Sequence, residues 1–394
     1  MDTQIPAPGK QVVIAKKALQ TLFDALRSAG YQIVGPTIRQ EAIVYDEIER
    51  IEDLPVGWTD EHAAGAYRLR RRDDGLYFGY VVGPDSWKKY LYPSRQKLFN
   101  YNRLSDGDGR ADDHNNNGDG PFAVETGQET QKAPRYAFVG VRGCELAAIN
   151  VQDHIFLDGR YQELHYKARR ERAFLLGVNC TEPGETCFCA SMGTGPRCNA
   201  ECDLVLTELD DSFLVEVGSE LGAEMLADCQ WHAAGAFESK QARRLLAEAE
   251  TQMGRTLETG DLPDLLYDNL DHPRWDDVAE RCLSCTNCTM VCPTCFCHTV
   301  EDASDLTGRH TERVRVWDSC FNPDFSHVYG GNLRPNVRAR YRQWLTHKLA
   351  SWIDQFGMSG CVGCGRCITW CPAAIDLTEE VTAIRTAAEP ENVQ

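Results

Sequence analysis

The segment 281–372 contains two cysteine runs with the same spacing, one at each end. The first is CLSCTNCTMVCP at 282–293, and the second is CVGCGRCITWCP at 361–372. In each run two residues separate the first three cysteines, three residues precede the fourth, and a proline follows it. Two intervening residues let a tight loop turn three thiols to one side, and proline ends that loop because it fixes φ and has no N–H.

This spacing is typical of the ferredoxin-type iron–sulfur run, in which three close cysteines hold one cluster and the fourth reaches across to the other. A zinc ribbon needs only two CxxC pairs, and disulfides need an oxidising compartment. We therefore expect two [4Fe–4S] clusters. One is held by Cys282, Cys285, Cys288 and Cys371, and the other by Cys361, Cys364, Cys367 and Cys292.

Composition narrows the class of protein. The 394 residues carry 41 basic and 59 acidic side chains, a net charge of −18, which argues against nucleic acid or an anionic membrane as a general partner. The N-terminus lacks the pattern of a signal peptide, and apolar stretches such as Ala173–Val178 are far too short to span a membrane. Eighteen cysteines without an export signal indicate metal binding in a reducing cytoplasm.

The pattern of residues 1–256 predicts a mixed α/β domain. An amphipathic helix is expected over Lys10–Gly30, with Leu19, Leu22 and Leu26 on its buried face. Short strands are expected next, including Ala42–Tyr45, Tyr67–Arg70 and Tyr77–Val82.

The segment 105–132 is rich in Asp, Asn and Gly and is expected to be a mobile insertion. Its start at Asp113 resembles an EF-hand loop, but Val124 stands where the bidentate Glu should be, so we attach no function to it.

Further along, apolar runs predict buried strands that alternate with helices, as in a sheet covered by helices. The strands are Tyr136–Val141, Ala173–Val178, Leu204–Leu209 and Phe213–Val217, and the helices are Cys144–Val151, Tyr161–Arg170, Leu221–Asp228 and Phe237–Met253. The chain contains neither G-x-G-x-x-G nor G-x-x-x-x-G-K-[ST], so we expect no dinucleotide bound through those loops.

A second group of cysteines lies in this α/β region. Cys144 and Cys180 each follow a predicted buried strand, and the carboxyl ends of strands are where ligands collect. Cys187 and Cys189 lie in a Gly/Pro-rich loop that can bend around an object. These four thiols predict a third [4Fe–4S] cluster; zinc and inert buried cysteines are the alternatives.

Residues 257–394 are expected to form the dicluster, mostly helical domain, joined through the segment 257–275. Cys295, Cys297 and Cys320 are surplus to its two clusters and either line the first cluster or are plain buried thiols. A helix is predicted over Asn336–Ile353, with a basic and solvated side that includes Lys348. Cys198 and Cys202 are weaker ligand candidates, and Cys229 is expected in the core.

Four blocks carry a family resemblance: GVRGCELAAINVQDHIF (140–156), GVNCTEPGETCFCASMGTGP (177–196), CTNCTMVCPTCFCHTV (285–300) and VWDSC (316–320). They resemble the beta, iron–sulfur subunit of cytoplasmic NiFe sulfhydrogenases and, equally, the corresponding iron–sulfur subunit of anaerobic sulfite reductase. The likeness extends over most of the chain.

The resemblance implies a non-catalytic electron-transfer subunit of an oxidoreductase complex. A flavin-bearing, NAD(P)-binding subunit would exchange electrons with it, and the small and large subunits of a NiFe hydrogenase would be its catalytic partner. The alternatives are a siroheme sulfite reductase complex and an iron–sulfur redox sensor. No Ser/His/Asp or Cys/His arrangement indicates catalysis in the chain itself.

Overall fold

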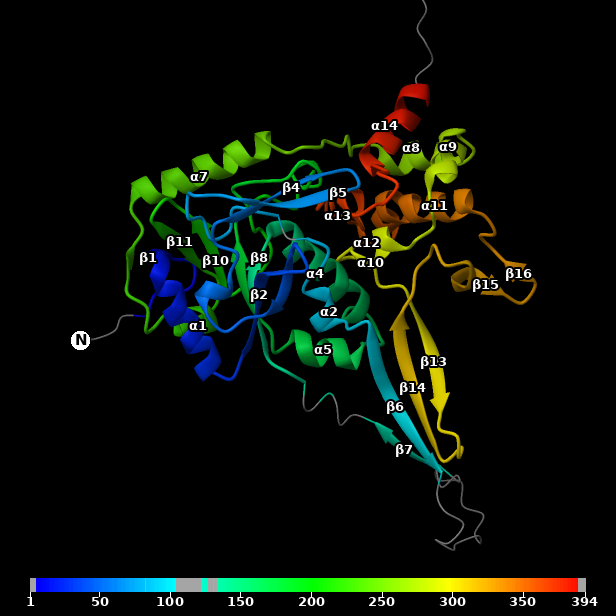
Figure 1. Ribbon diagram of the computed structural model, residues 1–394, viewed down its shortest axis with the longest axis horizontal. Coiled ribbons are helices and arrows are strands. Elements are labelled where there is room, and N and C mark those ends of the chain that lie inside the picture. The colour runs from blue at the N-terminus through cyan, green and yellow to red at the C-terminus, as the bar shows by residue number, and fades with distance from the viewer. Residues whose placement is uncertain (1–4, 82, 104–121, 127–129, 131–132, 389–394) are drawn as a thin grey trace, which may run out of the picture.

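A computed structural model describes residues 5–81, 83–103, 122–126, 130 and 133–388 (Figure 1). Its largest element is an eight-stranded sheet with the order β12-β1-β11-β10-β9-β8-β2-β3. The strands are β12 (Trp231–Ala233), β1 (Gln11–Ala15), β11 (Ser212–Val217), β10 (Leu204–Glu208), β9 (Phe174–Val178), β8 (Tyr136–Val141), β2 (Gln32–Arg39) and β3 (Ala42–Glu47).

The centre of the sheet is parallel and its two sides are antiparallel. Strand β9 pairs in parallel with β8 and β10, and β8 with β2, whereas β11, β1, β12 and β3 run antiparallel to their neighbours. A central parallel strand is covered on both faces and is therefore apolar throughout. This explains why all five residues of β9, FLLGV, are buried.

Helices pack on this sheet. The contacts join α1 (Leu19–Ser28) to β2, α4 (Gly143–Phe156) to β9, and α6 (Glu220–Met225) and α7 (Ala236–Thr251) to β11, while α5 (Leu164–Arg170) lies against α2 (Lys88–Leu91). The mixed α/β class predicted for this region is confirmed.

Two local predictions were wrong. Residues 11–15 form strand β1 rather than the first turns of a helix, because the β-branched Val12, Val13 and Ile14 suit a strand paired on both edges. Helix α1 begins at Leu19, with Leu22 and Leu26 buried as expected. Residues 77–81 form no strand, since the backbone N–H groups of Tyr77 and Phe78 donate to the carboxylate of Glu208 instead of to a neighbouring strand.

The dicluster region is a group of short helices beside the sheet, on the right in Figure 1. They are α8 (Leu262–Asp268), α9 (Arg274–Arg281), α10 (Asn287–Met290), α11 (Val337–Thr346), α12 (Trp352–Phe356), α13 (Arg366–Thr369) and α14 (Leu377–Ala388). Trp275, Trp344, Leu345 and Leu349 are buried in its own apolar core. No helix in the described part of the chain is long and apolar enough to cross a membrane.

A second sheet takes strands from both sides of the predicted boundary at 256/257. Its order is β13 (His298–Ser304), β14 (His310–Trp317), β6 (Arg95–Arg103) and β7 (Phe122–Thr126), and Figure 1 shows it extending from the body as an arm. Strand β7 lies inside the segment expected to be a mobile insertion. Most of the rest of that segment, including the residues that resemble an EF-hand loop before Val124, lies outside the described residues. The domain boundary stays a prediction.

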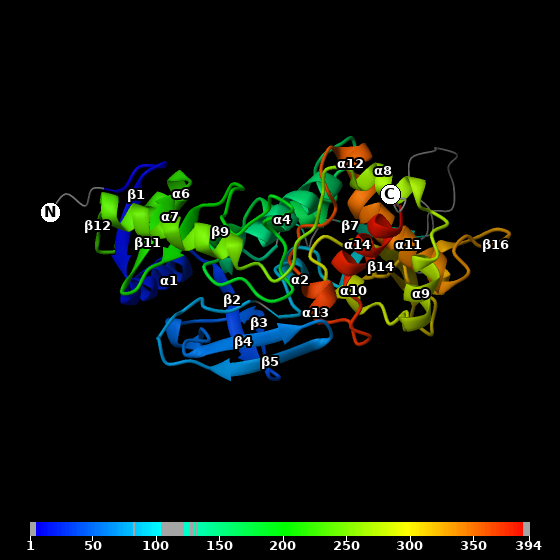
Figure 2. The same cartoon turned by 90° about the horizontal axis from the view of Figure 1, so that it is seen from above.

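Two short hairpins complete the described elements. The hairpin β4 (Trp58–Ala63) and β5 (Ala66–Arg71) lies to one side of the large sheet in Figure 2, and its turn reaches α13, where the Gly65 N–H donates to the Ile368 carbonyl at 3.1 Å. The hairpin β15 (His327–Val328) and β16 (Gly331–Asn332) lies near the base of the arm.

Candidate metal centres

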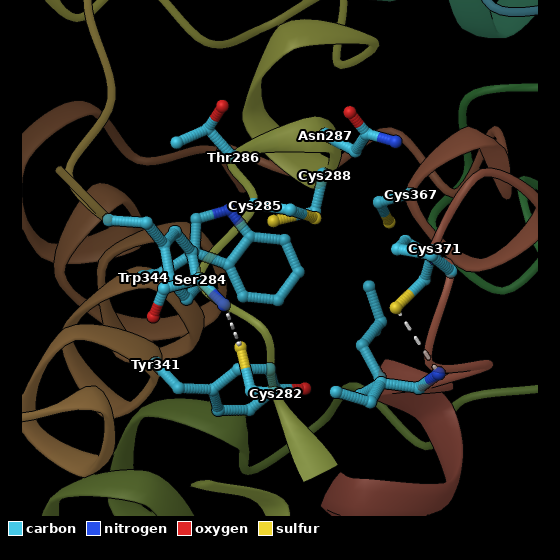
Figure 3. A pocket seen from close by; sticks show the side chains of 14 residues that line it. Cys282, Ser284, Cys285, Thr286, Asn287, Cys288, Tyr341, Trp344, Cys367 and Cys371 are labelled. Carbon is cyan, nitrogen blue, oxygen red and sulfur yellow. Dashed lines mark hydrogen bonds between the residues drawn. The ribbon is translucent and has the colours of Figure 1, made fainter.

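The first cavity is lined by the four cysteines predicted for the first cluster. Cys282 ends helix α9, Cys288 lies on α10, Cys285 lies in the loop between them, and Cys371 comes from the second run. Figure 3 shows the sulfur atoms turned toward one open space, with Tyr341 and Trp344 at its wall.

Backbone donors reach two of these sulfurs. The Ser284 N–H lies 3.5 Å from Cys282 Sγ, and the Ile375 N–H lies 3.4 Å from Cys371 Sγ, both as dashed lines in Figure 3. Hydrogen bonds of this kind stabilise thiolate ligands of a cluster. The donor set and its surroundings therefore fit a [4Fe–4S] cluster.

The two cysteine runs share one loop conformation. Ser284 and Thr286 have φ values of 50° and 69°, and the residues at the equivalent positions of the second run, Gly363 and Gly365, have 66° and 72°. Residues other than glycine seldom adopt this left-handed region. The backbone thus repeats wherever the cysteine spacing repeats, even where the side chains make that conformation costly.

The cysteines predicted for the second cluster also lie together. Burial raises the pKa of the Cys361 thiol to about 11 and that of Cys364 to about 12, and the charges of Cys361, Cys364 and Cys367 all interact with Cys292. The pKa of Cys292 is lowered, first by its contact with Cys295 and then by the ammonium of Lys348, whose Nζ lies 3.3 Å from Cys292 Sγ.

A third cavity brings together the four cysteines predicted for a third cluster. It is lined by Cys144, Cys180, Cys187 and Cys189. Cys144 lies at the start of α4, directly after β8, and Cys180 follows β9, so both lie at the carboxyl ends of neighbouring parallel strands. The atom-free space at the first and third cavities, open solvent included, is about 430 and 440 Å³. The two are therefore alike in size and in donor set.

Two buried arginines line the third cavity. Arg142 donates to the carbonyls of Phe78 and Tyr80 at 2.6 and 3.0 Å, while its buried Nε has no hydrogen-bond partner. Arg366 pairs with the buried Glu145 at 2.6 Å. A buried cation with an unused donor favours an anion nearby, as a thiolate-ligated cluster would be. The residues of this cavity also fit such a cluster.

The thiols of the third cavity influence one another. Burial raises the pKa of Cys180 and Cys187, and the contact between Cys144 and Cys189 lowers the pKa of the former and raises that of the latter. A metal centre would bind these cysteines in the thiolate form.

The three sites form a line of neighbours, in which the second adjoins each of the other two. Cys367, predicted for the second cluster, also lines the first cavity, and Cys364 of the same set also lines the third. The Cys187 Sγ lies 3.9 Å from the carbonyl oxygen of Cys364. Each outer site thus adjoins the middle one through a single cysteine.

The surplus thiols lie beside the middle of this line. Cys295 contacts Cys292, and Cys297 contacts Cys320, whose charge interacts in turn with Cys288. The Sγ atoms of Cys198 and Cys202 both lie beside Gly177 of β9. Cys229 is buried in the core as predicted.

All eighteen cysteines are free of disulfides. Within the part of the chain that the structure describes, no group of three or more His, Cys, Asp or Glu side chains could hold a single metal ion.

The charged residues around these sites were not predicted. Lys348, expected on a solvated helix face, is only 6% exposed, because the helix is π-helical over His347–Ser351 and this changes which side chains face inward. Lys88, Arg142, Glu145 and Arg366 are buried as well. The sequence offered one signal for such residues, a charged side chain within two positions of a cysteine. Arg142, Glu145 and Arg366 have it.

Comparison with known proteins gives two findings. Residues 281–375 match the 4Fe-4S dicluster domain family. The chain is 33% identical over 372 residues to the sulfhydrogenase 2 subunit beta of Pyrococcus furiosus, covering 92% of this chain and 95% of that protein. It belongs to the sulfhydrogenase beta-subunit family.

Membership of this family confirms the predicted resemblance, and the dicluster match confirms an iron–sulfur protein with a ferredoxin-type domain. No solved structure matches the chain significantly.

Proposed function

We propose that this sulfhydrogenase beta-family protein relays electrons through three [4Fe–4S] clusters. The observation that carries the proposal is the line of three cysteine sites, in which Cys367 of the second set also lines the first cavity and Cys364 of that set also lines the third. The ligands would be the three predicted cysteine sets, and each cluster supplies one-electron transfer when bound.

The chain's own residues have defined parts in this relay. The backbone N–H groups of Ser284 and Ile375 hold the sulfurs of Cys282 and Cys371 in place. Trp344 and Phe321 form an apolar part of the wall of the first site. Arg142 and the Arg366–Glu145 pair provide charge at the third site.

The name of the relative, sulfhydrogenase 2 subunit beta, supports a chain that works with other subunits. We propose a flavin subunit that uses NAD(P)H at one end of the line and the subunits of a NiFe hydrogenase at the other, all in the cytoplasm. Eighteen free cysteines suit that reducing compartment. A siroheme sulfite reductase is the second candidate catalytic partner, and nickel or siroheme in the purified complex decides between them.

The test separates the relay from catalysis. In the intact complex, replacing both Cys187 and Cys189 with Ser should abolish NAD(P)H-linked hydrogen turnover, because the line is cut at its third site. Hydrogen turnover with a small artificial dye should persist, because the dye exchanges electrons directly with the catalytic subunits. NAD(P)H-linked turnover that stays at the unsubstituted rate would contradict the proposal.

A matched control is the replacement of Cys229, a buried cysteine remote from the three sites, with Ser. This variant loses a thiol from the core but none from the line. Both activities should stay unchanged in it.

A further inference from the structure

Two lysines are buried beside the middle site. Lys348 is 6% exposed, and its Nζ lies 3.3 Å from Cys292 Sγ, 2.9 Å from Thr294 Oγ1 and 3.3 Å from the Gly360 carbonyl. Lys88 is 3% exposed and donates to the carbonyl oxygens of Cys292 and Cys295 at 2.9 and 3.2 Å. Its ammonium also lies over the Trp317 ring, 4.0 Å from the centroid.

Neither lysine has a carboxylate partner in the described part of the chain, where the ion pairs involve other side chains. Burying an ammonium without an anion is costly. Among the described contacts of Lys348, the group that can carry negative charge is the sulfur of Cys292, 3.3 Å from its Nζ. As a cluster ligand this sulfur would be a thiolate, and it would balance the ammonium.

The three sites differ in the lysines and arginines that surround them. None of the residues that line the first cavity is a lysine or an arginine. At the third cavity Glu145 neutralises Arg366, which leaves Arg142 as the unpaired cation. Only at the second site does an ammonium touch a predicted ligand sulfur among the described contacts.

Charge near a cluster sets its reduction potential, because reduction adds a negative charge that a nearby cation stabilises in a medium of low dielectric. We propose that Lys348, assisted by Lys88, gives the cluster of Cys292, Cys361, Cys364 and Cys367 a higher reduction potential than the cluster of Cys282, Cys285, Cys288 and Cys371. An electron shared between these two clusters then favours the second. This inference builds on the ligand sets of the proposed function.

The test is an EPR-monitored redox titration of the purified holoprotein. Lys348→Met keeps the length and the apolar stem of the side chain and removes its charge. At a fixed potential, the ratio of reduced to oxidised second cluster should fall about tenfold, which corresponds to about 59 mV for a one-electron couple. Lys348→Arg keeps the charge and should restore most of the shift. Lys240→Met, at an exposed position of α7, should change nothing.

Iron content is measured on every variant. If Lys348→Met loses iron, Lys88→Met decides, because the Lys88 Nζ donates only to backbone carbonyls and should shift the same signal in the same direction by less. Retained iron with unchanged potentials in the deciding variant would overturn the inference. The proposed relay fails differently, through an iron content of two clusters or uninterrupted NAD(P)H-linked turnover in the Cys187 and Cys189 variant.

Discussion

Gly363 lies where the loop of the third site packs against the second cysteine run. Its φ is +66°, and a Cβ there would lie 2.7 Å from the backbone of Cys189. Phe188 N–H also donates to the Gly363 carbonyl at 2.9 Å. The glycine thus allows two cysteine loops to touch, which joins the second and third sites.

Gly363→Ala should lower the free energy of unfolding by about 1–3 kcal/mol, because it adds backbone strain and a clash. Urea unfolding of the anaerobic protein measures this. Ser284→Gly is the matched control at the equivalent left-handed position of the first run and should be neutral or slightly stabilising, since glycine relieves strain there. An equal loss in both variants would refute the explanation.

Glu145 is the buried anion that connects three elements. It accepts from Arg366 Nη2 and from Tyr45 Oη, both at 2.6 Å, and burial raises the pKa of Tyr45 well above its ordinary value. Glu145→Ala leaves the Arg366 guanidinium buried and unpaired, so we expect a loss of about 3–5 kcal/mol in unfolding free energy.

Glu248→Ala is the control for that variant. Glu248 forms an exposed ion pair with Arg244 at 3.5 Å on α7, and its loss should cost no more than about 0.5 kcal/mol. Comparable losses in the two variants would show that the buried pair has no special weight.

The buried His347 predicts that the stability of the protein depends on pH. Burial, and then the charge of Lys348, lowers its pKa to about 4 from the ordinary value of about 6.5. The unfolded chain therefore binds more protons between pH 6.5 and 4, so this contribution to stability is present above pH 6.5 and is lost as the pH falls toward 4.

His347→Gln should flatten that dependence. Unfolding free energies at pH 7.5 and 5.5 measure it, and the difference between them should be smaller in the variant. An unchanged difference would contradict the assignment to His347, because the protons taken up on unfolding would then bind to other groups.

Strands and ligand loops could be predicted where a pattern of neighbouring residues marks them. The buried strands β8, β9, β10 and β11 followed from apolar runs, and the ligand loops followed from cysteine spacing. Strand β1 was missed because its five residues alternate too little to be told from an amphipathic helix. The orientation of Lys348 was missed because a π-helical segment leaves no clear mark in the side-chain pattern.

Arg315 on strand β14 connects the arm to the body of the molecule. Arg315 is 3% exposed, pairs with Glu163 beside α5 at 3.1 Å, and lies 3.9 Å from the Tyr92 ring centroid. Arg315→Met should cost about 1–3 kcal/mol, because a half-buried carboxylate loses its partner. Limited proteolysis should then cut the arm faster, whereas Arg313→Met, which breaks the exposed pair with Asp302, should not increase cutting. Equal cutting in the two variants would contradict this.

At the scale of the whole molecule, the sequence predicted the three cysteine sets but not their order. The order depends on Cys367 of the second set lining the first cavity and Cys364 of that set lining the third, which is a matter of three-dimensional packing. The charges that distinguish the sites come from Lys88, Arg142 and Lys348, which are far apart in the chain. Arg142 lies two residues before Cys144, but no spacing rule relates Lys88 or Lys348 to the cysteines they approach.

The central claim is a third cluster that extends the electron path into the large sheet. Iron and acid-labile sulfide, measured on anaerobically purified protein, test it most directly. Three clusters predict about twelve irons per chain, falling to about eight when Cys187 and Cys189 are both replaced with Ser. About eight irons in the unsubstituted protein, unchanged by that replacement, would contradict the claim and confine the path to the dicluster domain.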